Sequence, residues 1–252
     1  MKLKANLHLH SNEDPLDKET ISYTAKQAIK EAKKHNFDVL AFTLHTRYIH
    51  SLDLVKYAKN KGVLLISGIE QYIDGRHVLI LNCNPDVEEV KTFTSLREYK
   101  KNNPEIFIIA PHPYFQGPIS LREKLEENID LFDAVEHSWF FTKLINRNKK
   151  AKEVAKKYNL PLISTSDTHK LKYLNNNYIT VETKEKTTQA FFKDIKEGNF
   201  TNHIQPARII QDMIYEVGIK QFLLHPFKFF FGEQITRQTS ESKKYKLLEQ
   251  KY

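Results

Sequence analysis

The sequence is poor in cysteine, glycine and proline, and it has no long apolar run. Cys83 is the one cysteine among 252 residues, which excludes an internal disulfide and a zinc site built from several thiolates. Glycine and proline together number 7 + 9 = 16 residues, and 40% of the chain is hydrophobic, so neither a collagen-like chain nor a disordered linker fits. The first residues lack the apolar stretch of a signal peptide, and no segment is apolar for the length of a membrane span. We therefore expect a cytoplasmic protein with a sizeable core.

The charge is unbalanced towards basic residues. Lysine and arginine number 39 against 31 acidic residues, a net charge of +8. This excess favours an anionic partner, such as a phosphorylated substrate or a nucleic acid. The lysines are spread along the chain, however, and a lysine-rich surface also serves solubility alone.

Short apolar runs alternate with segments of helical period. The predicted strands cover residues 3–8, 38–44, 63–67, 77–82, 106–110, 134–135, 162–166 and 178–181. The predicted helices cover residues 20–35, 52–62, 92–101, 121–128, 144–158 and 188–197. This alternation is typical of a parallel sheet covered by helices, and seven or eight such units in about 200 residues predict a closed β/α barrel.

The C-terminal part of the chain has a different pattern. An aromatic run at 222–231 is followed by a polar and charged segment, 233–252. We expect a barrel domain over 1–205 and a partly helical extension over 206–252. The aromatic run is expected to pack on the barrel or on another subunit; a membrane-surface or partner-binding segment is the alternative.

Residues that can bind a metal follow the predicted strands at their carboxyl ends. They are His8, His10, His45, Glu70, His112, Asp167 and His169. In a β/α barrel these ends meet at one mouth, where active sites are built. Residues two apart on an extended chain point to the same side, so both members of His8-x-His10 and of Asp167-x-His169 face this mouth.

Imidazole nitrogen combined with carboxylate oxygen suits zinc, iron or manganese. With this many candidate ligands the mouth has room for two or three ions, and a carboxylate such as Glu70 is placed to bridge them. Bridged ions clamp a phosphoryl group and lower the pKa of a bound water to about 7. A lone histidine is more often an ordinary surface or core residue, and we interpret His35, His50, His203 and His225 in that way.

The same residues carry a resemblance to a known family. The ordered motifs are His8-Leu9-His10-Ser11, Leu44-His45, Gly68-Ile69-Glu70, Ala110-Pro111-His112-Pro113 and Ser166-Asp167-Thr168-His169. Over residues 1–205 this order resembles the PHP (polymerase and histidinol phosphatase) family of metal-dependent phosphoesterases. The resemblance implies a distorted (β/α)7 barrel with a multinuclear metal site, commonly of three ions. It makes His8, His10, Glu70 and Asp167 ligands, with Glu70 bridging, and matches His45, His112 and His169 to further metal positions.

Two expected ligands have competing candidates. Asp14 and Asp17 both follow the first motif at a suitable distance, and the spacing of Asp17 resembles the polymerase-type pattern better. Near Val135, Glu136 and His137 compete, and strand alternation lets only one of them reach the metals; we assign Asp17 and His137.

Two positions differ from the family pattern, and one further histidine has two possible roles. Leu44 stands where members often have aspartate, and Glu13-Asp14-Pro15 replaces the usual Ser-Asp-Gly. His77 matches a family histidine that contacts substrate or supports the ligands, and a structural role is equally open.

The function expected is hydrolysis of a phosphate ester, a phosphomonoester or a nucleotide or oligonucleotide phosphoester, by a metal-bound hydroxide. His169 or His112 protonates the leaving alkoxide. Arg47, Arg76 and Lys170 are placed in sequence to hold a second phosphate or a carboxylate, unless they are plain surface charges.

Two rival functions use the same residues. An amidohydrolase that cleaves C–N bonds also opens with His-x-His on a barrel strand. A non-catalytic PHP module would keep the metals for stability and bind nucleic acid through its basic charge. The natural substrate, the choice between monoester and diester, the metal and the oligomeric state stay open at this point.

Overall fold

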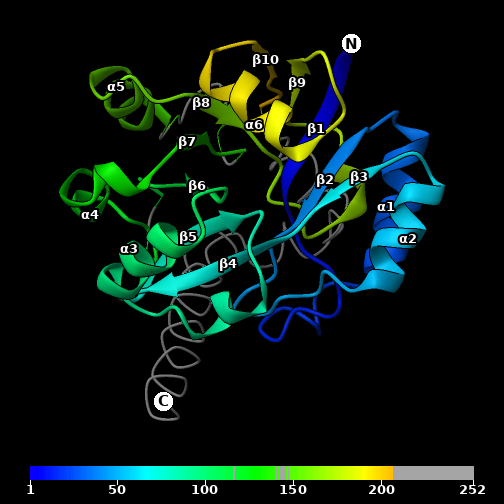
Figure 1. Cartoon of the computed structure of the whole chain (residues 1–252), viewed down its shortest axis with the longest axis horizontal. Helices are drawn as coiled ribbons and strands as arrows, with labels where there is room; N and C mark the ends of the chain where they lie inside the picture. The colour runs from blue at the N-terminus through cyan, green and yellow to red at the C-terminus, as the bar shows by residue number, and fades with distance from the viewer. Residues whose placement is uncertain (116, 140, 142–145, 147, 207–252) are drawn as a thin grey trace, which may run out of the picture. The chain divides into compact units, whose positions relative to one another are not determined.

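A computed structural model describes residues 1–206, except 116, 140, 142–145 and 147 (Figure 1). From residue 207 onward, the expected C-terminal extension and its aromatic run at 222–231 lie outside the described residues, so the domain boundary near 205 stays a prediction. None of the described helices has both the length and the apolar character that crossing a bilayer requires.

The strands form two five-stranded sheets, ordered β10-β9-β1-β2-β3 and β4-β5-β6-β7-β8. Their bounds are β1 Lys2–Leu9, β2 Val39–Phe42, β3 Leu64–Ile66, β4 Gly68–Ile73, β5 Arg76–Leu81, β6 Phe107–Ala110, β7 Ala134–His137, β8 Leu162–Ser164, β9 Tyr178–Glu182 and β10 Phe200–His203. The helices are α1 Ala25–Lys34, α2 Leu52–Asn60, α3 Phe93–Asn102, α4 Glu123–Glu127, α5 Asn148–Lys157 and α6 Thr188–Lys196, with short 3-10 turns η1 Pro85–Glu89, η2 Ile129–Leu131 and η3 Leu171–Tyr173. Figure 1 shows α1 and α2 along one flank and α3, α4 and α5 along the other.

The sheets are mixed, although the sequence pattern predicts parallel pairing. β1, β2 and β3 are parallel, as are β6, β7 and β8. β9 and β10 are antiparallel additions, and β4 and β5 form an antiparallel hairpin that also reverses direction against β6. The hairpin turns at Asp74 and Gly75, whose φ angles of 48° and 74° are the two positive values of a type I′ turn.

The expected closed barrel is not present in the described part of the chain. Instead, two isolated bridge pairs join the sheets, Leu9 with Thr168 and His45 with Glu70. All four residues lie at the end of the molecule where the candidate ligands gather. The architecture is therefore α/β with two sheets that meet along this rim.

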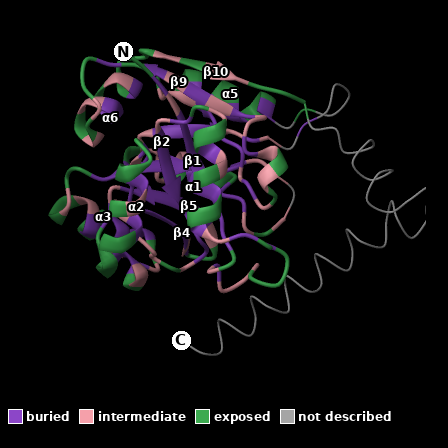
Figure 2. Ribbon diagram, turned by 90° about the vertical axis from the view of Figure 1, so that its right-hand side faces the viewer, coloured by how far each residue is buried: buried purple, intermediate pink, exposed green. Residues whose placement is uncertain are grey.

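Three buried apolar clusters support the rim from below. One fills the space between the sheets, with Leu7, Ile66, Leu79 and Ile109 among its members. The other two lie between the sheets and the flanking helices, and Figure 2 shows the central strands buried while the helices keep exposed outer faces.

Helix α1 illustrates how the local sequence builds these layers. Thr24 and Gln27 form a capping box at its N-terminus. The apolar face predicted from the helical period is confirmed, since Ala25, Ala28, Ile29 and Ala32 are all buried.

Candidate metal centre

Ligand-type side chains from both sheets converge at one rim, most of them at or after the carboxyl ends of strands and two near the amino ends of β4 and β5. His8 lies near the end of β1, Glu70 within β4 and His77 within β5, and the other members follow β1, β2, β6 and β8 or end β7. The buried members are His8, His10, Asp14, His45, Glu70, His77, His112 and Glu136. Asp167 and His169 complete the cluster at its more exposed edge. The convergence expected at a barrel mouth thus occurs at the junction of two sheets.

The carboxylate of Glu70 lies at the centre of the cluster. Its Oε2 is 3.2 Å from Nε2 of His8, 3.4 Å from Nε2 of His10 and 3.2 Å from Nε2 of His45; its Oε1 is 2.6 Å from Nδ1 of His77 and 3.1 Å from Nε2 of His112. Each oxygen therefore faces imidazole nitrogens from more than one strand. A carboxylate that bridges two cations needs this arrangement.

Asp167 is the second carboxylate of the centre. Its Oδ1 is 3.4 Å from Nε2 of His8, 3.3 Å from Nε2 of His10 and 3.4 Å from Nδ1 of His169. The backbone of Asp167 has a φ of 44°, and that of His112 has a φ of 28°. Residues other than glycine seldom adopt such positive φ values, and functional sites are where they concentrate.

The side-chain amide of Asn6 holds the segment on both sides of Asp167. Its Nδ2 donates to Oγ of Ser166 at 2.5 Å and to the carbonyl of Leu174 at 3.1 Å, and its Oδ1 accepts from the backbone N–H of Ser166 at 3.3 Å. The Ser166 hydroxyl also hydrogen-bonds the hydroxyl of Thr168. Sequence reasoning missed Asn6 because these partners lie 160 or more positions away along the chain.

Asp14 and Asp17, the two alternatives for one ligand position, occupy different places. Asp14 is fully buried, and its Oδ2 accepts from Nδ1 of His10 at 2.9 Å and from the backbone N–H of His45 at 2.8 Å. Asp17 lies nearer the surface, with Oδ2 3.4 Å from Nδ1 of His45 and 3.4 Å from Nε2 of His169. Asp14 thus contacts the inner histidines, and Asp17 the outer edge of the cluster.

Glu136 and His137, the second pair of alternatives, point in opposite directions. Glu136 is buried, and its Oε1 accepts a hydrogen bond from Nδ1 of His8 at 2.8 Å. His137 packs edge-on against the ring of Phe141, with ring centroids 5.2 Å apart. Strand alternation therefore turns Glu136 towards the cluster and His137 towards Phe141.

The residues assigned to substrate binding lie at different depths. His77 is buried beside Glu70, as described above. Arg76 donates to the carbonyls of Pro118 and Ser120, so its guanidinium supports the loop around them. Arg47 and Lys170 are exposed near the rim, and Nη1 of Arg47 lies 3.4 Å from the carbonyl of Glu13.

The pKa values of the cluster reflect mutual pairing of its charges. Burial by itself lowers the pKa of His8, but Asp167, Glu70 and Glu136 outweigh burial and raise it to about 10. Burial by itself raises the pKa of Glu70, but the imidazoles of His77 and His8 hold it well below its ordinary value. At His77 burial is the larger effect, and the pKa falls to about 4. Without a cation, His8 is therefore an imidazolium paired with carboxylates, whereas His77 is neutral.

The donor set fits divalent cations. Four groups of three residues have ligand atoms within 4.8 Å of one another, namely His8-Glu70-His112, His8-His10-Asp167, His10-Asp14-His45 and His45-Glu70-His77. Nε2 of His10 is buried without a hydrogen-bond partner among the described residues, although it faces two carboxylates. Nitrogen and oxygen donors arranged in this way match zinc, manganese or iron.

Comparisons with known proteins agree with this arrangement. A family model described as PHP-associated matches residues 146–200. The search of curated proteins found no match. Among solved structures, the chain resembles a two-domain protein from Bacteroides vulgatus that contains a predicted PHP-like metal-dependent phosphoesterase, with a TM-score of 0.64 and 20% identity over 81% of this chain. The match spans 65% of that protein, slightly under two thirds of its length.

Two further structures share the fold at low identity. A lesion-specific endonuclease from Pyrococcus furiosus aligns with a TM-score of 0.58 and 16% identity, over 80% of this chain and 58% of that one. An amidohydrolase from Chromobacterium violaceum aligns with a TM-score of 0.51 and 13% identity, over 82% of this chain and 99% of that one. The matched family model and this shared fold support the resemblance to the PHP family that the motifs indicate.

Proposed function

We propose that this protein is a metal-dependent phosphoesterase that hydrolyses a phosphate monoester or a nucleotide or oligonucleotide phosphoester. The observation that carries this proposal is the position of Glu70, whose two oxygens face five imidazoles, together with Asp167, whose Oδ1 faces the same Nε2 atoms of His8 and His10. A site of this composition binds two or three cations around a central carboxylate.

The inner residues hold the cations. We assign this role to His8, His10, Asp14, His45, Glu70, His112 and Asp167, because Asp14 belongs to one of the converging groups, whereas Asp17, assigned from the sequence, lies at the outer edge. Divalent zinc, manganese or iron bound there neutralises charge on the phosphoryl oxygens and lowers the pKa of water to about 7. His137 is left out of this set because its ring packs on Phe141.

His169 is placed to handle the proton of the leaving group. Its side chain is 35% exposed, against 9% for His112, and its ring stacks on His10 with centroids 4.3 Å apart. Asp17 lies 3.4 Å from its Nε2 and orients the ring, and an imidazole at this exposed edge is placed to pass a proton to a leaving alkoxide. Because Nε2 of His112 faces Glu70 instead, we assign His112 to the cations rather than to acid catalysis.

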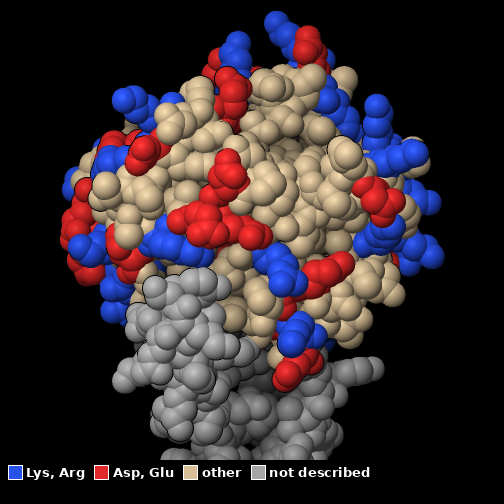
Figure 3. Space-filling view, turned by 60° about the horizontal axis from the view of Figure 1, so that its bottom comes forward, with Lys and Arg blue, Asp and Glu red and all other residues tan. Residues whose placement is uncertain are grey.

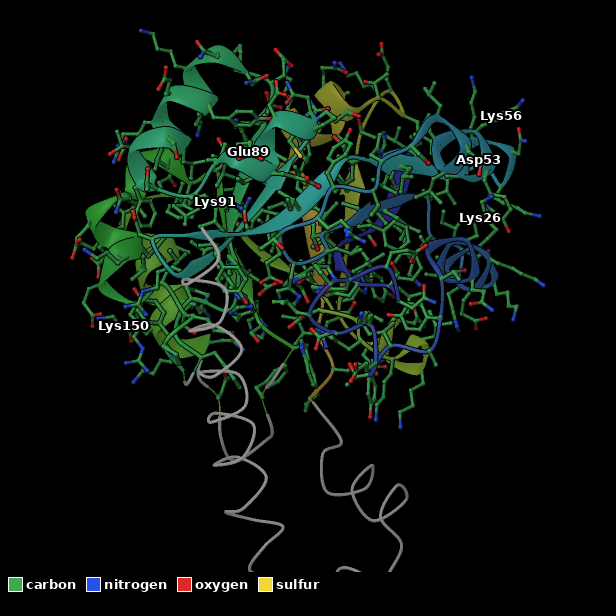
Figure 4. The ribbon with its side chains drawn as sticks, turned by 90° about the horizontal axis from the view of Figure 1, so that it is seen from below. Lys26, Asp53, Lys56, Glu89, Lys91 and Lys150 are labelled. Atoms are coloured by element: carbon green, nitrogen blue, oxygen red, sulfur yellow. The ribbon has the colours of Figure 1, made fainter. Side chains whose placement is uncertain are left out.

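Charged groups near the rim supply the contacts for the rest of the substrate. Arg47 and Lys170 are exposed there and carry the charge that a second phosphate or a carboxylate needs. Figure 3 shows Lys and Arg scattered over one face and its edges, with acidic side chains among them. The labelled charges of Figure 4 likewise include Lys26, paired with Asp53 at 2.6 Å, and Lys150 on the opposite side. The basic excess is therefore dispersed, and it supports no extended nucleic-acid track by itself.

Hydrolysis of a C–N bond is the second candidate, since an amidohydrolase shares the fold. A decisive experiment measures bound metal in protein purified without chelator and then offers it p-nitrophenyl phosphate, bis-p-nitrophenyl phosphate, an oligonucleotide and a p-nitroanilide. We expect release of p-nitrophenol that chelation abolishes and manganese restores. Asp167→Asn should be inactive, while Asp86→Asn, an exposed control, should match the wild type. Turnover of the anilide alone would favour the amidohydrolase, and salt-dependent oligonucleotide binding without turnover would favour a binding module.

A further inference from the structure

Glu136 contacts the centre through its neighbours. Its Oε1 accepts from Nδ1 of His8 at 2.8 Å and from the hydroxyl of Thr165, and its Oε2 accepts from the backbone N–H of His112 at 2.5 Å. Glu136 lies on β7, whereas its partners lie on β1, after β8 and after β6. One buried carboxylate therefore ties four neighbouring chain segments together beneath the cluster.

We infer that Glu136 is a positioning residue that fixes which nitrogen of His8 faces the cations, an inference that rests on the cation-binding part of the proposed function. A neutral imidazole has one N–H and one lone pair. When the ring gives up a proton to bind a cation, Nδ1 keeps the hydrogen that it donates to Glu136, so the lone pair belongs to Nε2, which lies 3.2 Å from Oε2 of Glu70 and 3.4 Å from Oδ1 of Asp167. The hydrogen bond thus orients the ring and selects the tautomer that can bind a metal.

The second oxygen of Glu136 acts on the main chain. His112 has a φ of 28°, a conformation that costs free energy for a residue with a side chain. The hydrogen bond from its backbone N–H to Glu136 holds this conformation, which directs Nε2 of His112 to 3.1 Å from Oε1 of Glu70. Glu136 thereby positions two of the proposed ligands at once.

Direct binding of a cation by Glu136 fits the contacts less well. Three donors already occupy its two oxygens, those of His8, Thr165 and His112. Within the described part of the chain, the groups of three residues whose ligand atoms converge do not include Glu136. The carboxylate therefore acts through His8 and His112.

The test measures the binding of Mn²⁺ alone to the full chain, from which metal has first been removed. Calorimetry gives the affinity, and metal analysis gives the number of bound ions. Glu136→Gln keeps an acceptor for Nδ1 of His8 but brings an amide donor towards the backbone N–H of His112, so Mn²⁺ affinity should fall about 10-fold. Glu136→Leu removes both acceptors, so Mn²⁺ affinity should fall about 100-fold. The number of bound ions at saturation should stay as in the wild type. Glu153→Gln, an exposed change on α5, is the matched control and should leave affinity unchanged.

The outcomes separate the possibilities. Circular dichroism of each metal-free variant checks that it is folded, and Thr165→Val offers a milder loss of the same network should the leucine variant unfold. Loss of one whole ion in Glu136→Gln, with unchanged affinity for the rest, would overturn the inference in favour of a direct ligand, and wild-type affinity in Glu136→Leu would overturn it outright. Wild-type protein that binds Mn²⁺ but cleaves no phosphate ester would defeat the proposed function while leaving this inference standing.

Discussion

Glu70 and His45 meet twice, once through their backbones and once through their side chains. Their backbones form one of the two bridge pairs that join the sheets, with N–H of Thr46 donating to the carbonyl of Glu70 at 2.9 Å. Their side chains approach to 3.2 Å between Nε2 of His45 and Oε2 of Glu70. The junction of the sheets and the candidate metal centre are therefore one structure, and a change in either should affect the other.

Replacing Glu70 by glutamine should destabilise the metal-free protein. The variant leaves buried imidazolium groups without their central counter-charge, and breaking a buried ion pair from one side costs roughly 3–5 kcal/mol. Urea denaturation at pH 7 with chelator present measures the free energy of unfolding. Glu98→Gln, an exposed change on α3, should stay within about 0.5 kcal/mol of the wild type. Equal stability of the two variants would show that the pairing contributes nothing.

Metal binding should release protons and strengthen as pH rises. In the metal-free protein the carboxylates raise the pKa of His8 to about 10, so at pH 7 its ring is protonated. A cation binds only the neutral ring, so binding must release the proton. Below that pKa, the affinity for the cation should therefore rise about tenfold per pH unit for each proton released. Titrations with Mn²⁺ between pH 6 and 9, in buffers of different ionisation enthalpy, count the released protons. Affinity that is flat across this range would contradict the pairing.

Asn6→Ala should weaken both the fold and the metal site. The change leaves the buried backbone N–H of Ser166 and carbonyl of Leu174 without partners, which costs about 1–3 kcal/mol. It also releases the segment that holds Asp167 at its positive φ, so Mn²⁺ affinity should fall as well. Urea denaturation and calorimetry measure the two effects, and Asn60→Ala, exposed at the end of α2, is the control. A stable variant with normal Mn²⁺ affinity would show that Asp167 needs no such support.

The single thiol should be inert in the folded protein. Cys83 is buried, and burial raises its pKa to about 12. At pH 8 almost none is thiolate, the species that reacts with disulfide reagents. Ellman's reagent should therefore label no thiol in native protein and one thiol per chain in guanidinium chloride. Rapid labelling of the native protein would mean that this part of the core opens readily.

Local patterns predicted much of this molecule. The apolar period in Ala25, Ala28, Ile29 and Ala32 indicated a helix with that buried face, because a helix exposes one face to solvent and packs the other. The sequence analysis did not predict strand β4. Its residues are nearly all buried, so apolar and polar residues do not alternate along it, although the Asp74-Gly75 pair is typical of a hairpin turn.

The candidate ligands of the metal centre could also be predicted from the sequence, because histidines and carboxylates near the ends of strands can be recognised without knowing how the strands pair. Which of them touch depends on how the two sheets meet, and that is set by the pairing of segments distant in sequence. Glu70 between five imidazoles, Asn6 beneath Asp167 and Glu136 against His8 are relations of this kind. Only tertiary structure decides them, because a hydrogen bond depends on distance and direction in space, while the local sequence determines only which donors and acceptors are available.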